Sequence, residues 1–243
     1  MAIPRRFRRF VVRPLLGIPL LIGLFTGWRY EIGNTGAIIP GRAYRSAQLS
    51  PRGIAREIQE HRIRTVINLR GTNPDQDWYR AERAAVLDAG ATLVDIPMAS
   101  DHWLSRGQAR SVIEILDRCA PPFLIHCEWG AERTGLIAAW TELLRPGGSL
   151  ASARGQFSIY YLFLPIKDGP TMRKHLDRYE SWLKTRGAAH DPALFRLWAT
   201  REYRPGYPSR DDWMYDPYPL VQITEPDREA TARRQAGAQT ETR

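Results

Sequence analysis

The chain has 243 residues, a length that accommodates one ordinary domain together with extensions at its ends. A hydrophobic fraction of 43% is normal for a globular protein, and the formal charge of +9 raises the question of nucleic-acid binding. Only three residues are lysines, the arginines are scattered, and no zinc-finger spacing or Gly-rich RNA-binding motif is present, so we expect no nucleic-acid partner.

A basic and then apolar stretch opens the chain. Five arginines within residues 5–13 precede an uninterrupted apolar run over residues 14–28. This order is typical of a signal anchor or a cleaved signal peptide, and a buried soluble helix is the third interpretation. No Ala-x-Ala cleavage site follows, so we predict a basic N-terminus and transmembrane signal anchor over residues 1–30, with Trp28 and Tyr30 at the membrane interface. The positive-inside rule then places the rest of the chain on the extracytoplasmic, periplasm-like side.

From residue 31 onward, segments of strand and helix character alternate. Ser50-Pro51 predicts a helix start, since serine caps a first turn and proline fits its first position. Ser105 and Gln108 have the spacing of a capping box. The alternation predicts an α/β fold with a mainly parallel central sheet flanked by helices. Strands are predicted at residues 63–69, 92–96 and 123–125, and further helices at residues 76–89 (ended by Gly90), 105–118, 132–144, 150–161 and 171–185.

The character of the chain changes after residue 186, which we take as the end of a domain that begins at residue 31. Residues 187–223 mix aromatic residues with prolines and predict an irregular C-terminal extension that wraps on the domain. Residues 224–243 are polar and poor in aromatic residues, and such a composition predicts a disordered tail.

The two cysteines, Cys119 and Cys127, are predicted to stay unpaired. The segment between them is expected to form a strand, which rises about 3.3 Å per residue, whereas bridged Cα atoms lie roughly 4.4–6.8 Å apart. Cys119 is interpreted as a small buried hydrophobic residue. Histidines and cysteines lack the spacing of metal ligands, so we expect neither a metal nor a cofactor.

The stretch from His126 to Gly135 follows a buried strand and opens a helix. A loop in this position directs backbone N–H groups at an anion, and the helix dipole favours negative charge there. Gly130 allows a close approach of the backbone. Arg133, six residues after Cys127, can return over the sulfur, bind two phosphate oxygens and lower the cysteine pKa. The predicted phosphate-binding residues are Glu128, Trp129, Gly130, Ala131, Glu132 and Arg133.

This pattern predicts transfer of a phosphoryl group to an ionised Cys127. The Thr134 hydroxyl is placed to help the thiolate depart, while His126 is expected to brace the loop. Such a reaction also needs a group that protonates the leaving oxygen and later activates water. We assign that role to Asp101, because it lies in a loop, in preference to Asp95 within a strand. A solvated loop charge is the alternative interpretation of Asp101.

The ten residues from His126 to Gly135 resemble the phosphate-binding loop of the cysteine-dependent protein tyrosine phosphatases, especially the dual-specificity branch. Residues 44–48 (YRSAQ) and 66–70 (VINLR) are similar to that branch as well. The resemblance covers about residues 38–185 and implies a tyrosine-phosphatase-like fold. Arg45 and Arg70, within these stretches, either support the site or form buried salt bridges.

The resemblance also implies a role for each motif residue. Cys127 corresponds to the nucleophile, Arg133 to the phosphate ligand that stabilises the transition state, Thr134 to the group that assists thiolate departure, and Asp101 to the general acid. His126 and Gly135 complete the loop as supporting residues. The assignment of Asp101 departs from the pattern of the larger tyrosine phosphatases, because the Trp-Pro-Asp triplet is absent here.

Several substrates fit this motif. Glu128 and Glu132 should repel a polyanion, which argues against inositol polyphosphates, although Glu132 could instead pair with an arginine. The remaining substrates are a phosphorylated protein (on tyrosine, serine or threonine) and a phosphorylated membrane lipid or lipid-linked sugar. Sulfur transfer, arsenate reduction and a catalytically inactive phosphate-binding module are the alternative functions. The complete set of nucleophile, anion cradle and acid favours a phosphatase over them.

Overall fold

A six-stranded mixed sheet forms the centre of the domain, in the order β1-β2-β5-β3-β4-β6. The structure, a computed structural model, describes residues 19–164, 169–214, 216 and 219–227. The four inner strands run parallel, in agreement with the predicted mainly parallel sheet, although β2 is not among the predicted strands, and each edge strand is antiparallel to its neighbour. The strands are β1 (Gly36–Ile39), β2 (Ala43–Ser46), β3 (Thr65–Asn68), β4 (Thr92–Asp95), β5 (Phe123–His126) and β6 (Gln222–Thr224).

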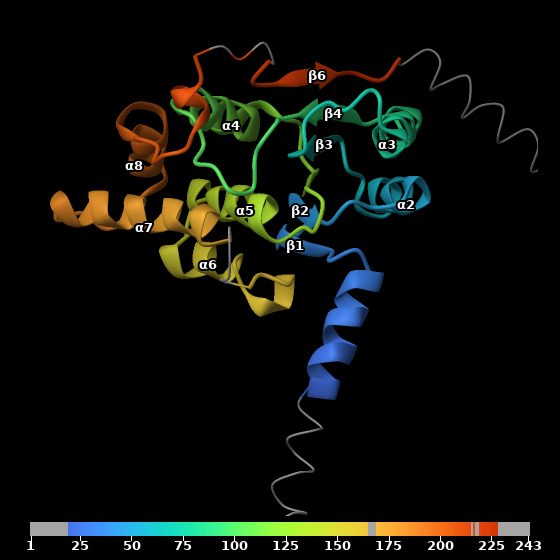
Figure 1. Ribbon diagram of the computed structural model, residues 1–243, viewed down its shortest axis with the longest axis horizontal. Coiled ribbons are helices and arrows are strands. Elements are labelled where there is room, and N and C mark those ends of the chain that lie inside the picture. The colour runs from blue at the N-terminus through green and yellow to red at the C-terminus, as the bar shows by residue number, and fades with distance from the viewer. Residues whose placement is uncertain (1–18, 165–168, 215, 217–218, 228–243) are drawn as a thin grey trace, which may run out of the picture.

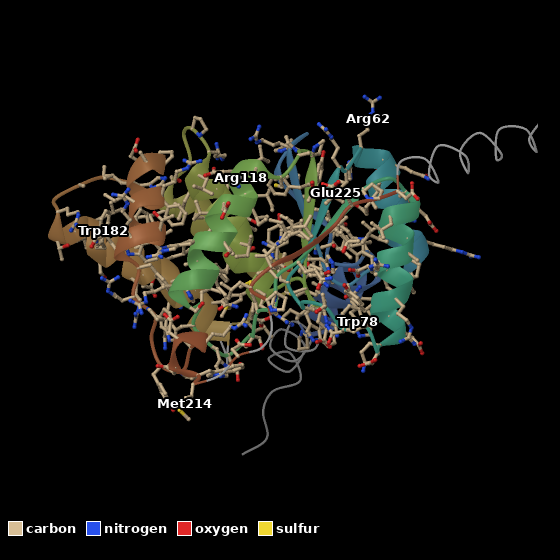
Figure 2. All side chains as sticks on the ribbon, turned by 90° about the horizontal axis from the view of Figure 1, so that it is seen from above. Arg62, Trp78, Arg118, Trp182, Met214 and Glu225 are labelled. Atoms are coloured by element: carbon tan, nitrogen blue, oxygen red, sulfur yellow. The ribbon has the colours of Figure 1, made fainter. Side chains whose placement is uncertain are left out.

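Helices cover both faces of this sheet: α2 and α3 lie on one face, and α4 and α5 lie on the other with the remaining helices packed outside them (Figure 2). The helices are α2 (Pro51–His61), α3 (Asp77–Asp88), α4 (Arg106–Arg118), α5 (Glu132–Leu144), α6 (Leu150–Gly155), α7 (Gly169–Thr185) and α8 (Pro192–Leu197). Shorter helical segments are η1 (Ile159–Tyr161), η2 (Trp198–Glu202) and η3 (Arg210–Asp212).

Successive residues of the inner strands supply two separate apolar cores. On β3, Val66 packs in the core beneath α2 and α3, whereas Ile67 packs in the core beneath α4 and α5. Leu124 and Ile125 divide in the same way on β5. Strand side chains alternate between faces, and both faces are covered here, so consecutive central residues of β3 and β5 are apolar, whereas Asn68 and His126 at their carboxyl ends are polar.

Local signals set the helix ends where the sequence predicts them. The Ser50 side chain accepts a hydrogen bond from the N–H of Gly53, and Ser105 forms a reciprocal capping box with Gln108. Gly90, after α3, has a φ of +81°, a left-handed conformation that favours glycine. These caps confirm the predicted starts of α2 and α4 and the predicted end of α3.

The carboxyl ends of the parallel strands bring four polar residues into one row. His126 is the register partner of both Ser46 and Asn68, and Asn68 is in turn the partner of Asp95. Cys127 follows His126 directly, so the loop that it begins lies at the middle of this edge. Open α/β sheets bind ligands at the carboxyl ends of their strands.

The edge strands differ from the prediction. Neither β1 nor β6 is expected from the sequence, and β6 lies in a stretch predicted to be irregular, with Thr224 falling in the predicted tail. β6 has one apolar residue, Ile223, so no strand pattern marks it in the sequence, and it forms because β4 offers a partner. The predicted helix over residues 150–161 also divides into α6 and η1. The rest of the predicted tail, residues 228–243, lies outside the described residues.

A helix over residues 19–31 projects from the domain near β1 (Figure 1). Leu20, Leu21 and Leu24 on this helix are exposed, whereas Arg29 is fully buried. Within the described ranges, no helix combines the length and the hydropathy that a bilayer crossing requires. The predicted anchor begins in residues 1–18, which lie outside the described residues.

Candidate active site

The loop between β5 and α5 forms an anion cradle around Cys127. Among the described residues, no carbonyl or side chain oxygen accepts from the N–H groups of residues 128–129, which leaves them available to a ligand at the N-terminus of α5. Gly130 has a φ of +69°, and a Cβ there would lie 2.7 Å from both Ser46 O and Ala47 N. Only glycine therefore lets the loop curl against the end of β2.

Two side chains hold this loop from behind. The fully buried guanidinium of Arg45 donates to Gly130 O (2.6 Å) and to the Gln156 carbonyl oxygen (2.8 Å). The Asn34 amide donates to Trp129 O at 2.9 Å. Because both carbonyls are bound from the outside, their peptide dipoles are fixed in orientation, which pre-organises the cradle before an anion arrives.

Cys127 is buried, and its surroundings favour the thiolate over the thiol. Burial alone would raise the pKa of its thiol, but the Arg133 guanidinium, the Thr134 hydroxyl and the backbone N–H groups of Thr134 and Gly130 together lower that pKa below its ordinary value. The Thr134 hydroxyl is buried and has no oxygen or nitrogen partner among the described residues, so the sulfur is the acceptor that it faces. A thiolate is the nucleophilic form of cysteine.

Arg133 provides a positive charge at the mouth of the phosphate-binding loop. It is the second residue of α5, and its Nη1 donates to Met98 O at 3.1 Å. It forms no ion pair with a carboxylate in the part of the chain that the structure describes, so its charge is available to a bound phosphate. A guanidinium can bind two phosphate oxygens at once.

His126 braces the loop through a buried ion pair with Glu82 of α3. Its Nε2 lies 3.0 Å from Glu82 Oε1, and both side chains are 1% exposed. Burial lowers the pKa of His126, but the Glu82 carboxylate and the adjacent Cys127 sulfur outweigh burial and raise it. The raised pKa favours the protonated imidazole, and a protonated His126 adds to the positive field around Cys127. Glu82 also accepts from the Gln48 amide, which ties α3 to the end of β2.

We predict that Glu82→Gln raises the pKa of Cys127. Without the carboxylate, His126 loses the charge that keeps it protonated, and the thiolate loses a nearby cation. The rate of Cys127 alkylation by iodoacetamide, measured against pH, reports this pKa. Glu114→Gln, an exposed carboxylate on α4 that pairs with Arg118, is the matched control and should leave the titration unchanged. An unchanged Cys127 titration in Glu82→Gln would contradict the role of the ion pair.

The two candidate acids lie in different environments. Asp95 is fully buried, and its carboxylate accepts from Asn68 Nδ2 and Tyr79 Oη, each at 2.7 Å, so both oxygens are occupied in the frame of the sheet. Asp101 lies in the loop before α4 with a half-exposed side chain, and its Oδ1 lies 2.7 Å from His102 Nδ1. This geometry favours Asp101 as the group that meets a leaving oxygen.

The basic limb of the pH profile of kcat/KM should report the pKa of Asp101, which depends on its hydrogen bond with His102. The hydrogen bond from His102 is the main cause that lowers the pKa of Asp101, and Arg133 adds to it. A general acid must be protonated, so activity falls as pH rises through this lowered pKa. His102→Ala removes the main cause and raises the pKa, which should move the basic limb of the profile to higher pH. An unmoved limb would exclude Asp101 as the acid.

The C-terminal extension holds the segment that carries Asp101. Tyr203 Oη donates to Leu104 O at 2.9 Å, and the Trp103 N–H donates to Pro208 O at 3.0 Å. Asp211 accepts from the N–H of Arg106 at 3.0 Å. The extension is therefore part of the active-site architecture, a role that its mixed aromatic and proline composition does not reveal.

Gly206→Ala tests this role of the extension. A Cβ on Gly206 would overlap the Trp103 indole, which is confined by the Arg178 guanidinium over its ring at 4.0 Å. We expect kcat to fall roughly 10- to 100-fold, because displacement of Trp103 would misplace the loop that carries Asp101. The inhibition constant of inorganic phosphate should stay unchanged, since the cradle is intact. Gly155→Ala, which introduces a Cβ into open space, is the matched control. Equal kcat values for both variants would contradict the prediction.

A cavity of about 440 Å³ opens beside the loop, and its wall includes residues 128–129, Gln48 and Arg70. Arg70 Nη1 donates to Gln48 Oε1 at 3.1 Å, and its guanidinium lies 3.6 Å from the ring centroid of Trp78 (labelled in Figure 2). Neither Arg45 nor Arg70 forms a salt bridge within the described ranges. Of the two predicted alternatives for these arginines, support of the site is the one that the contacts favour.

The two carboxylates of the loop lie in different surroundings. Burial lowers the pKa of Arg70, and the Glu128 carboxylate partly opposes this effect, which indicates that the two charges lie close together. Glu132, in the first turn of α5, makes no ion pair with an arginine in the described part of the chain, so the predicted pairing is not seen there.

Sequence reasoning misses Glu82, Asn34 and Gln156. One signal points to Glu82: it lies three residues after Tyr79 and four before Val86, so it is a carboxylate on the buried face of α3. No comparable pattern marks Asn34 or Gln156, which reach the loop only through the tertiary fold.

A family model described as "DSP-PTPase phosphatase fused to NAD+ Kinase" matches residues 40–164. No curated protein sequence matches the chain significantly. Among solved structures, that of P. aeruginosa TpbA is similar at 24% identity over 67% of this chain and 89% of that chain, with a TM-score of 0.44. A cysteine-to-serine variant of TpbA in complex with pTyr is similar at 23% identity over 67% and 88% of the two chains, with a TM-score of 0.44.

The core catalytic domain of the S. cerevisiae PP-IP phosphatase SIW14 is similar at 17% identity, over 63% of this chain and 93% of that chain, with a TM-score of 0.46. The family match is the informative comparison, because it spans more than half of the chain, from the start of the parallel sheet through the loop and α5. The chain therefore belongs to the family of dual-specificity-type protein tyrosine phosphatases whose model carries the description "DSP-PTPase phosphatase fused to NAD+ Kinase".

Proposed function

We propose that this chain hydrolyses phosphate monoesters through a covalent phospho-cysteine on Cys127. The observation that carries the proposal is the buried thiol itself, whose pKa is lowered by Arg133 and Thr134 at the centre of a pre-organised cradle. Buried cysteines ordinarily have raised pKa values, as Cys119 does here with a pKa raised to about 12 by burial. A buried cysteine whose pKa is nevertheless lowered is typical of a catalytic nucleophile.

The reaction proceeds in two displacements at phosphorus. The Cys127 thiolate attacks and forms the S–P bond, the bond from phosphorus to the leaving oxygen breaks, and Asp101 gives its proton to that oxygen. Water then attacks the phosphoryl group, Asp101 takes the water proton, and the S–P bond breaks to release inorganic phosphate. The Thr134 hydroxyl stabilises the departing thiolate. Arg133 and the loop N–H groups bind the phosphoryl oxygens throughout.

The charges around the loop favour a substrate with a single phosphate. The exposed Glu128 and the half-buried Glu132 would repel further phosphates on the same molecule. Phosphotyrosine, phosphoserine or phosphothreonine on a protein meets this requirement, and so does a membrane lipid or lipid-linked sugar with one phosphate monoester. We also propose that residues 1–30 anchor the chain to a membrane, with the catalytic domain outside the cytoplasm. Digestion of the domain by protease added to intact spheroplasts would support this sidedness, and full protection would oppose it.

Hydrolysis of p-nitrophenyl phosphate by the detergent-purified full chain tests the activity. We expect metal-independent turnover in the presence of a chelator, with competitive inhibition by vanadate. A chain that binds vanadate but releases no nitrophenol would instead be the inactive phosphate-binding module.

A further inference from the structure

Five aromatic side chains from three separate segments meet beside the phosphate-binding loop. Phe25, Trp28 and Tyr30 lie on the N-terminal helix, Trp129 lies in the loop, and Tyr160 lies in η1. Ring centroids are 6.1 Å apart for Tyr30 and Trp129, 6.3 Å for Phe25 and Tyr160, and 5.9 Å for Phe25 and Trp28. All but Phe25 are about half exposed or more. We call this set the aromatic rim.

Arg29 fixes the rim to the loop. Its side chain is 1% exposed, and its Nη2 donates to Asn34 Oδ1 at 2.7 Å and to Thr35 O at 3.0 Å. Its guanidinium also lies 4.3 Å from the ring centroid of Tyr160. Asn34 in turn donates to Trp129 O. A short chain of hydrogen bonds thus joins the N-terminal helix to the backbone of the anion cradle, and the helix cannot swing away without breaking it.

The helix carries the rim's apolar surface away from the domain (Figure 1). Leu20, Leu21 and Leu24 are each about two-thirds exposed, which is unusual for neighbouring leucines in water. The sequence before them stays apolar back to residue 14, and five arginines within residues 5–13 precede it. Tryptophan and tyrosine concentrate at membrane interfaces, and clustered arginines are attracted to anionic lipid headgroups. An anionic lipid bilayer matches this order of arginines, apolar residues and aromatic residues.

The cavity beside the phosphate-binding loop borders the rim. Tyr30 and Trp129 line the same cavity of about 440 Å³ as Gln48 and Arg70 of the site. Three carboxylates, Glu31, Glu57 and Glu128, share its wall with two arginines, Arg56 and Arg70, so the cavity beyond the cradle offers no surplus of positive charge for a second phosphate.

We infer that the aromatic rim rests in the interfacial layer of a lipid bilayer, and that the substrate is a lipid whose headgroup carries one phosphate monoester. This inference rests on the proposed function and names its substrate class. A bilayer that touches Trp129 delivers a headgroup phosphate directly to the loop, whereas a soluble phosphopeptide gains nothing from the rim. Confinement to one surface also raises the effective substrate concentration.

The activity arm compares two substrates with the full chain reconstituted into vesicles of phosphatidylcholine and phosphatidylglycerol. The lipid probe is phosphatidic acid in the same vesicles, and the soluble probe is p-nitrophenyl phosphate. A Phe25→Ser/Trp28→Ser double variant should lose at least about tenfold of its phosphatidic acid hydrolysis and keep its p-nitrophenyl phosphate hydrolysis. Met214→Ser, which alters a fully exposed apolar side chain on the C-terminal extension (labelled in Figure 2), should keep both activities. Equal loss of both activities in the double variant, or no loss of either, would overturn the inference.

A second arm does not depend on activity, so failure of the proposed function can be told apart from failure of the inference. Brominated phosphatidylcholine quenches tryptophan fluorescence on contact, and the difference between the wild type and Trp129→Phe isolates the signal of Trp129. We expect Trp129 to be quenched in reconstituted full-length protein. Absence of Trp129 quenching by the brominated lipid would overturn bilayer contact, whether the chain is a monomer or a dimer. A wild type that hydrolyses p-nitrophenyl phosphate but not phosphatidic acid would overturn the substrate class.

Discussion

Cys127→Ser is expected to lower kcat for p-nitrophenyl phosphate by at least about 10⁴-fold, because loss of an enzyme's nucleophile removes most of the chemical rate. The field of Arg133 and Thr134 that ionises a thiol cannot ionise a serine hydroxyl, whose intrinsic pKa is far higher. The cradle itself is unchanged, so vanadate should still bind. Phosphate release measured by a coupled assay gives the rate, and equilibrium dialysis gives the binding.

Cys119→Ser is the matched control for this variant. The Cys119 thiol is half-buried, its pKa is raised to about 12, and it therefore carries no thiolate at neutral pH. The Cys119→Ser variant should therefore retain the wild-type kcat. Activity that survives in Cys127→Ser, or that disappears equally in Cys119→Ser, would exclude Cys127 as the nucleophile.

Arg133→Lys should lower kcat/KM by about 10²- to 10³-fold, the usual cost of removing one fixed donor from a charged transition state. Lysine keeps the charge but cannot donate two parallel hydrogen bonds to a phosphoryl group. The thiol pKa of Cys127 should change little, since a cation remains nearby, and iodoacetamide titration checks this. Arg145→Lys, at the opposite end of α5 and paired there with Glu142, is the matched control. A kcat/KM of Arg133→Lys within a few-fold of the wild type would contradict bidentate binding.

The sequence predicts the contiguous part of the site well, because one strand–loop–helix unit contains it. From Phe123 to Leu144 the predicted strand and helix match β5 and α5, and the conformation of Gly130 follows from its place in the curled loop. Capping serines likewise act within one turn of the chain, so Ser50 and Ser105 define their helices without tertiary information.

The unpredicted parts depend on contacts between distant segments. Glu82 acquires its role only when α3 packs against the sheet beside His126, and Arg45 only when η1 and α6 bring Gln156 to the same place. The C-terminal extension, which holds the segment that carries Asp101, depends on distant contacts in the same way, because the hydrogen bond from Tyr203 to Leu104 joins residues 99 positions apart in the sequence. Strand β6 also needs the exposed edge of β4 before its three residues can pair.

Direct trapping of the intermediate tests whether catalysis proceeds through a phospho-cysteine on Cys127. Wild-type protein is mixed with ³²P-labelled aryl phosphate, quenched with acid on the millisecond timescale, digested, and examined by mass spectrometry. A phospho-cysteine intermediate predicts one labelled peptide, with the phosphoryl group on the Cys127 sulfur, and no label in Cys127→Ser. Label on the adjacent His126, or turnover with no labelled protein at any quench time, would contradict the phospho-cysteine mechanism.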